Sequence, residues 1–229
     1  MVKAIRKPLE EIVELVGERA RVLVVGCGGC TSVCLAGGQR ETLALAAELA
    51  ECRRQGRAPI ETACWTVERQ CDAQYLAELE EMTGKCDCVL SMACGAGAQH
   101  LAEAYPALPV FPAVNTTFVG IDRDVGLYEE RCRTCGDCML GYTGGICPVA
   151  RCAKSIFNGP CGGTHADGTC EVGEVPCAWN AIYERLKGQG RLEGILNFRA
   201  PMGWIDKGPG AFVQRGYEPR YPTKQGARQ

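Results

Sequence analysis

Seventeen cysteines stand among the 229 residues of this chain, a density well above that of ordinary globular domains. Residues 1–9 carry basic side chains, but Glu10, Glu11 and Glu14 follow where a secretory signal needs an unbroken apolar core. No stretch reaches the roughly 20 apolar residues that span a bilayer. We therefore expect a cytoplasmic protein without a membrane span. In that reducing compartment, clustered cysteines indicate metal ligation or redox chemistry.

Charge is distributed unevenly along the chain. Residues 1–184 carry 16 basic and 24 acidic side chains, a net charge of −8, whereas residues 185–229 carry nine basic and three acidic ones, a net charge of +6. An acidic body lacks the basic face that neutralises phosphates, so we expect no nucleic-acid partner. The basic end favours a protein partner instead.

Alternation of apolar runs and amphipathic segments predicts a small α/β domain over residues 1–125. Helices are expected at 9–20, 39–54, 67–82 and 99–104, and strands at 21–26, 58–65, 87–93 and 109–114. Such alternation favours a doubly wound, parallel sheet. Residues 126–187 are loop-rich and Cys-rich, which predicts a metal-cluster domain. Residues 188–229 are rich in Gly, Pro and Arg and predict an extended docking tail with Trp204, Phe212 and Tyr217 as anchors.

One group of cysteines follows the predicted strands of the α/β domain. The candidate ligands in this group are Cys27, Cys30, Cys34, Cys64, Cys71 and Cys94. Because the carboxyl ends of parallel strands line the ligand crevice of an open sheet, we expect these thiols to converge. A [4Fe-4S] cluster needs four of them, and we predict Cys27, Cys30, Cys34 and Cys94, with Cys71 as the first substitute. The alternative, that the side chain is simply a small buried hydrophobe, applies to Cys52, Cys64, Cys86 and Cys88.

A denser group of eight cysteines occupies the second region. Its members are Cys132, Cys135, Cys138, Cys147, Cys152, Cys161, Cys170 and Cys177. Two consecutive Cys-x2-Cys steps and a later Cys-Pro resemble the way ferredoxins wrap [4Fe-4S] clusters, and eight thiols match two four-ligand sites. Four-cysteine zinc sites use the same steps, so zinc stays an alternative. We expect at least two [4Fe-4S] clusters in the chain, the ligand count also allows a third, and zinc is a further candidate metal.

The run CRTCGDCMLGYTGGICPVARCAKSIFNGPCGG (132–163), followed by TCEVGEVPCAWNAIYERL (169–186), resembles the C-terminal domain of the methylenetetrahydrofolate reductase family. Together with GCGGCTSVCLAGG (26–38), it resembles the MetV-type small subunits of that family. The resemblance implies an iron-sulfur subunit that sits against a catalytic subunit, a TIM barrel that binds FMN and folate. FMN is thus expected on the partner only, because a TIM barrel takes roughly 250 residues and its βα repeats are absent from this sequence.

Three functions follow as hypotheses. The first is an electron relay, without turnover of its own, in which a donor such as ferredoxin or a larger redox complex reduces this chain and the partner's flavin reduces methylenetetrahydrofolate. The second is a zinc-stapled structural adaptor of the same complex. The third is a separate α/β oxidoreductase with its own nucleotide. The sequence disfavours the third, because the fingerprint begun at Gly26 and Gly28 has Thr31 where its third glycine belongs.

Overall fold

The structure is a computed structural model that describes residues 1–54, 60–196, 198–201, 213–214 and 216–221. It divides into two compact units, Met1–Arg131 and Cys132–Gln229, a boundary six residues beyond the predicted one. The first unit contains β1 (Val2–Arg6), α1 (Leu9–Val16), β2 (Arg21–Cys27), α2 (Cys30–Val33), α3 (Gln39–Arg54), β3 (Glu61–Val67), α4 (Ala73–Leu76), η1 (Ala77–Leu79), α5 (Glu80–Thr83), β4 (Cys88–Ser91), α6 (Gly95–Ala104), β5 (Val110–Pro112), β6 (Val114–Asp124) and β7 (Leu127–Cys132). The second contains α7 (Pro148–Arg151), β8 (Thr169–Cys170), β9 (Gly173–Pro176), α8 (Ala178–Gly188), η2 (Leu192–Leu196) and η4 (Glu218–Arg220).

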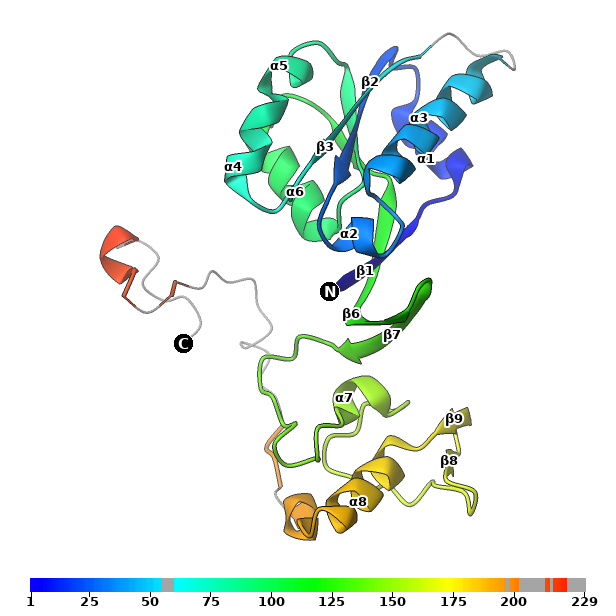
Figure 1. Cartoon of the computed structure of the whole chain (residues 1–229), viewed down its shortest axis with the longest axis vertical. Coiled ribbons are helices and arrows are strands. Elements are labelled where there is room, and N and C mark those ends of the chain that lie inside the picture. Colours follow the sequence, from blue (N-terminus) through cyan, green and yellow to red (C-terminus); the bar gives the residue numbers. More distant parts are fainter. Residues whose placement is uncertain (55–59, 197, 202–212, 215, 222–229) are drawn as a thin grey trace. The chain divides into compact units, whose positions relative to one another are not determined.

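A four-stranded sheet in the order β3-β2-β4-β5 forms the centre of the first unit, and all its neighbouring strands are parallel. The prediction of a mixed α/β domain with a parallel sheet is therefore confirmed. Its central strand, β2, is buried along nearly its whole length, as a parallel strand covered on both faces must be. Helices α1 and α3 lie on one side of this sheet and α4, α5 and α6 on the other (Figure 1).

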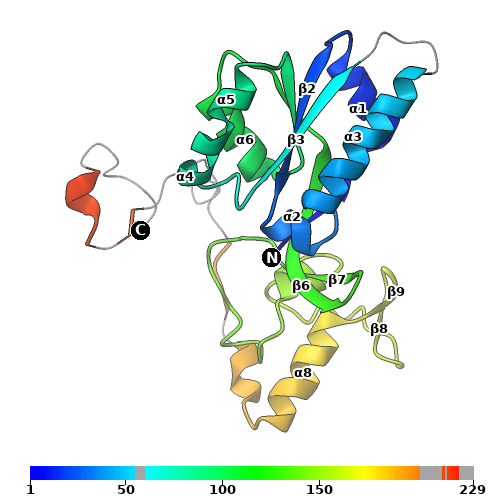
Figure 2. The same ribbon diagram turned by 45° about the horizontal axis from the view of Figure 1, so that its top comes forward.

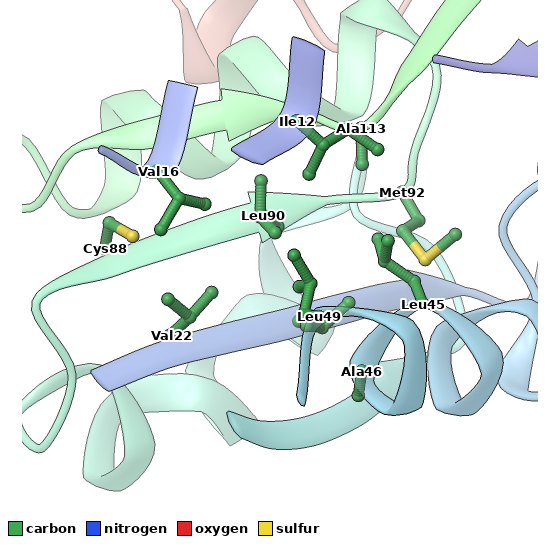
Figure 3. Packing of buried hydrophobic residues seen from close by; sticks show 11 residues of the cluster. Ile12, Val16, Val22, Leu45, Ala46, Leu49, Cys88, Leu90, Met92 and Ala113 are labelled. Carbon is green, nitrogen blue, oxygen red and sulfur yellow. The ribbon is translucent and has the colours of Figure 1, made fainter. Parts of the chain in front are cut away.

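Each face of the parallel sheet has its own apolar core. Alternate residues of β2 and β4, such as Val22 and Leu90, pack with Ile12 of α1 and with Leu45 and Leu49 of α3 (Figure 3). The residues between them pack on the opposite face, where the cluster consists of Leu23, Val25, Val67, Leu76, Leu79, Val89 and Leu101. This alternation follows from the period of two along a strand, and it makes the sheet doubly covered.

The sequence did not predict the second sheet of this unit. Its order is β1-β6-β7, and β1 pairs antiparallel with β6 from Val2 opposite Val119 to Arg6 opposite Val114. Residue 114 was expected to end the last strand, but β6 continues to Asp124 and turns into β7.

Two predicted elements differ from the observed ones in ways that affect the thiols. The helix expected at 67–82 is replaced by a loop followed by the short helices α4, η1 and α5. Because this loop carries Cys71, that residue is not inside a helix. The strand expected to end near Cys64 instead runs on to Val67, so Cys64 lies within β3.

The second unit has little regular structure besides α8 and the β8-β9 hairpin (Figure 2). Its apolar core gathers around one face of α8, and the buried members are Ile146, Cys152, Cys170, Cys177, Ala178, Trp179, Ile182 and Leu186. Within the part of the chain that the structure describes, no helix is both long and apolar enough to cross a bilayer.

Candidate metal centre

Four cysteines lie at the carboxyl ends of three neighbouring parallel strands. Cys27 ends β2 and Cys30 begins α2 directly after it. Cys71 lies in the loop between β3 and α4, and Cys94 is the N-cap of α6, just beyond β4. The chain passes from β2 to β3 on one side and then crosses back to β4 on the other side of β2, so the direction of the crossovers reverses beside β2. Such a switch point is where open α/β sheets bind ligands.

The thiol of Cys71 lies within electrostatic reach of the other three. Burial raises the pKa of the Cys71 thiol, and Cys27, Cys94 and Cys30 raise it further, because thiolates at neighbouring positions repel one another. A bound cation would remove this repulsion. Cys71 is exposed whereas Cys27 is buried, so the set reaches the surface of the unit at Cys71.

Gln70 holds the loop between β3 and α4 against the sheet. Its side chain is fully buried, and Nε2 donates hydrogen bonds to the carbonyl oxygens of Val25 (2.8 Å) and Gly26 (3.1 Å). Its Oε1 accepts a hydrogen bond from the hydroxyl of Ser91 (2.6 Å). The carbonyl oxygen of Gln70 lies 3.0 Å from Nδ1 of His100. This single residue therefore ties the loop to the ends of β2 and β4 and to α6.

A glycine on α6 lets the helix approach this loop closely. A Cβ atom on Gly97 would lie 3.0 Å from the Cβ of Gln70 and 2.7 Å from the Cβ of Ala93, which is closer than side chains tolerate. Sequence reasoning missed both Gln70 and Gly97, because neither belongs to a motif. The one available signal was the position of Gln70, a polar residue between a strand and a candidate ligand.

Cys34, which was predicted to be a ligand, faces a different environment. The turn of α2 carries its side chain to β1, where Sγ accepts a hydrogen bond from the backbone N–H of Ala4 (3.3 Å). The side chain is 2 % exposed and packs with Ala4, Ala36 and Val114. The structure thus brings Cys71 toward Cys27, Cys30 and Cys94, and it places Cys34 in an apolar cluster.

The remaining cysteines of the first unit pack among apolar side chains. Cys88 belongs to the core beneath α1 and α3, where burial raises the pKa of its thiol to about 11. Burial likewise raises the pKa of Cys64, within β3, and of Cys86. Their apolar surroundings fit the alternative that these cysteines are small buried hydrophobes. The side chain of Cys52 lies outside the described residues.

Three thiols of the second unit are part of its apolar core. Cys152 follows α7, Cys170 ends β8 and Cys177 is the N-cap of α8, and each is at most 9 % exposed. The Thr164 hydroxyl donates a hydrogen bond to the Cys177 sulfur (3.0 Å). Burial opposes ionisation of Cys177, but this hydrogen bond and the backbone N–H groups at the start of α8 outweigh it and lower the pKa of its thiol.

Cys161 lies close to this buried group but is exposed. Its sulfur is 3.8 Å from Nζ of Lys154, and Lys154 also forms an ion pair with Glu171, the neighbour of Cys170. Lys154 therefore links the segment of Cys161 to the segment of Cys170. A lysine near a thiol favours the thiolate, which is the metal-binding form.

The other four thiols of the second unit stand outside the buried core, and they are Cys132, Cys135, Cys138 and Cys147. The loop that carries them turns at Thr134 (φ +50°) and Gly136 (φ +87°). In the described residues, no group of three or more Cys, His, Asp or Glu side chains is close enough to form a ready metal cage. The ligand sets therefore stay predictions, supported by donor chemistry and, in the first unit, by the position of four thiols at neighbouring strand ends.

Comparison with known proteins adds one match. Residues 111–205 match the family described as methylene-tetrahydrofolate reductase C terminal. The match includes all eight cysteines from Cys132 to Cys177, and it excludes the thiols of the first unit. This part of the chain is therefore similar to the C-terminal region of methylenetetrahydrofolate reductases, in agreement with the sequence-based resemblance. No curated protein and no solved structure matches the chain.

Proposed function

We propose that this chain is an iron-sulfur subunit of a methylenetetrahydrofolate reductase, of the small MetV type. The observation that carries the proposal is the placement of Cys27, Cys30, Cys71 and Cys94 at the carboxyl ends of neighbouring parallel strands. Four thiols are the ligand set of a [4Fe-4S] cluster. The match of residues 111–205 supports an association with methylenetetrahydrofolate reduction.

Clusters in this chain would supply one-electron transfer between an external donor, such as ferredoxin or a larger redox complex, and the FMN of a catalytic partner subunit. The residues around the thiols serve to hold them. Gln70 fixes the loop of Cys71, and the first turn of α6 fixes Cys94. The amide of Gly28 donates a hydrogen bond to the Val67 carbonyl (2.9 Å) and is thereby engaged, which disfavours a phosphate-binding role for this glycine loop.

A mixed metal content is the second candidate, and the buried thiols of the second unit favour it. Cys152, Cys170 and Cys177 lie in an apolar core, and structural zinc sites are closed, four-thiolate sites of this kind. In this version, zinc stabilises the fold of the second unit, and an iron-sulfur cluster in the first unit transfers electrons. The chain would still be a subunit of the same reductase complex.

Metal and acid-labile sulfide analysis of the anaerobically purified chain tests the proposal. We expect about eight iron atoms per chain for two clusters and about twelve for three. Cys71→Ser should remove about four of them, whereas the matched variant Cys34→Ser should leave the iron content unchanged. Loss of iron in Cys34→Ser but not in Cys71→Ser would reverse this ligand assignment. Iron near zero with stoichiometric zinc would contradict the electron relay and leave the adaptor function.

Co-purification with a flavoprotein tests the partner. The full chain should co-purify with an FMN-containing subunit. That subunit should reduce methylenetetrahydrofolate only when this chain is loaded with iron. The predicted anchors Trp204 and Phe212 lie outside the described residues, and the third, Tyr217, is half-exposed. Deleting residues 202–229 should leave the iron content unchanged and release the flavoprotein. Retention of the flavoprotein at full stoichiometry would show that the dock lies elsewhere in the chain.

A further inference from the structure

Beyond α8, the chain returns to the Cys-rich loop of the second unit. The segment 191–196 with 198–199, here called the strap, lies after the last cysteine and was predicted to belong to an extended tail. The Arg191 guanidinium donates a hydrogen bond to the carbonyl oxygen of Gly141 (2.8 Å). The backbone of Gly194 lies against Tyr142, because a Cβ on Gly194 would be only 2.6 Å from the Tyr142 carbonyl oxygen. The strap therefore packs on the loop between Cys138 and Cys147.

Arg199 ends the strap and is fixed on three sides. The side chain of Asn158 accepts a hydrogen bond from the Arg199 backbone N–H (2.9 Å) and donates one to its carbonyl oxygen (2.7 Å). The guanidinium stands over the ring of Tyr142, 5.8 Å from its centroid. It also forms an ion pair with Asp137. Only 19 % of the Arg199 side chain is exposed, although Asp137 is 65 % exposed.

Asp137 lies between Cys135 and Cys138, in the turn of residues 135–138 that is here called the knuckle. Its ion pair with Arg199 therefore connects the strap to the knuckle. Within this knuckle the Cys135 thiol lies 3.6 Å from the carbonyl oxygen of Asp137, and the turn needs the positive φ of Gly136. Arg199 is also close enough to Cys135 for their charges to interact. An exposed ion pair alone contributes little. Here it is one contact of a set that includes two backbone hydrogen bonds and an aromatic ring.

We infer that Arg199 is a positioning residue for the knuckle 135–138, and that the strap helps the second unit to retain its metal. The inference rests on the proposed function, because it assumes that Cys135 and Cys138 bind metal. By holding Asp137 at its carboxylate, Arg199 restricts the conformations of the two thiols before metal arrives. A site whose ligands are held in this way loses metal more slowly than one whose ligands move freely.

A pair of truncations separates the strap from the residues that follow it. Both truncated chains also carry Cys30→Ala, so that metal bound at the first unit does not contribute to the measured metal content. The chain that ends at residue 201 should keep the metal content of the second unit. The chain that ends at 190 should lose metal at the thiols 132–147. Equal metal content and equal rates of metal release in the two truncations would overturn the inference.

Single substitutions test Arg199 without shortening the chain. Arg199→Met should increase the rate of metal release to a chelator about three- to tenfold. Arg191→Met, which keeps the knuckle contact, should change that rate less than twofold. Arg199→Asp and Asp137→Arg should each increase the release rate, and the double exchange should restore it to within about twofold of the parent. A double exchange as fast as the single variants would contradict the ion-pair role.

A metal-free readout distinguishes failure of this inference from failure of the proposed function. In the metal-free chain, alkylation of Cys135 and Cys138 by iodoacetamide, followed by mass spectrometry, should be three- to tenfold faster in Arg199→Met. Alkylation of Cys71, in the other unit, should be unchanged. If the parent binds no metal at the second unit, the proposed function fails there, and the alkylation rates still decide whether Arg199 positions the knuckle. Equal alkylation rates would overturn the inference.

Discussion

The two units of this chain differ in how their candidate metal ligands relate to the apolar core. In the first unit, apolar side chains fill both faces of a parallel sheet, and the four converging thiols lie beyond the strand ends. In the second unit, three cysteines are members of the apolar core itself. The first unit can therefore fold on its own apolar burial and bind metal afterwards. The second has a smaller apolar core apart from its thiols, so we expect metal to supply a larger share of its stability.

The largest expected effect is that of removing metal from the whole chain. Metal at a structural site contributes on the order of 10 kcal/mol, which is comparable to the whole stability of a small domain. We expect amide exchange in α8 to become faster after chelation without reaching the rate of an unfolded chain, whereas β2 and β4 keep their protection. Hydrogen exchange with mass spectrometry measures both regions in one sample. Unchanged amide exchange of α8 in the metal-free chain would contradict this difference between the units.

A core truncation in the first unit should have the next largest effect. Leu90 is fully buried between α1 and α3, so Leu90→Ala should lower the free energy of unfolding of this unit by about 2–5 kcal/mol. The loss should be the same with and without metal. Leu127→Ala, at a side chain that is 52 % exposed, is the matched control and should change stability by less than about 0.5 kcal/mol. Urea unfolding of the chain with and without metal measures these values.

Gln70→Ala should destabilise the first unit by about 1–3 kcal/mol, because the carbonyl oxygens of Val25 and Gly26 and the hydroxyl of Ser91 lose a buried partner. It should also weaken metal binding at Cys71. Gln74→Ala, at an exposed position of α4, is the control. Unfolding by urea and iron content are the two measurements. If the Gln70→Ala chain were as stable as the parent, the hydrogen bonds of the Gln70 side chain would not be needed to hold this loop.

The smallest effect concerns pH. The hydrogen bond from Arg6 lowers the pKa of Glu48 in the folded state below its ordinary value of 4.5. The resulting stabilisation is complete above about pH 5 and is lost as the pH falls through the lowered folded-state pKa. Because Glu48 is 40 % exposed, water screens the pair and its contribution is below about 1 kcal/mol. Glu48→Gln should therefore remove a small part of the pH dependence of unfolding below pH 5.

Local patterns were enough to predict the parallel sheet and α3, which runs over residues 39–54 as expected. They failed where the structure of a segment depends on contacts with residues far away in the sequence. The strand β1 pairs with residues more than a hundred positions away, and nothing in its own five residues indicates that partner. Since Cys34 is bonded to Ala4 of this strand, the sequence could not separate Cys34 from the other thiols of its loop.

The position of Cys71 was missed for a related reason. Apolar spacing over 67–82 resembles a helix, but the Gln70 side chain bonds to the carbonyl oxygens at the end of β2 and holds the chain in a loop. A side chain that bonds to a distant backbone leaves no periodic trace in the sequence. The candidate site could therefore be located at the strand ends, whereas the choice among its ligands needed the tertiary contacts.

The pairing of β1 with β6 also has a consequence during synthesis on the ribosome. Lys3 lies opposite Phe118, so a chain growing at 5–20 residues per second needs roughly 6–23 seconds to supply the partner of its first strand. In that interval Cys27, Cys30 and Cys34 have already been made, while the strand that receives Cys34 is unpaired. None of these three thiols is then held in the finished fold. Once β6 pairs with β1, Cys34 is buried against β1 and is separated from Cys27 and Cys30. Delivery of metal before that moment would meet a different ligand set from the one in the finished fold.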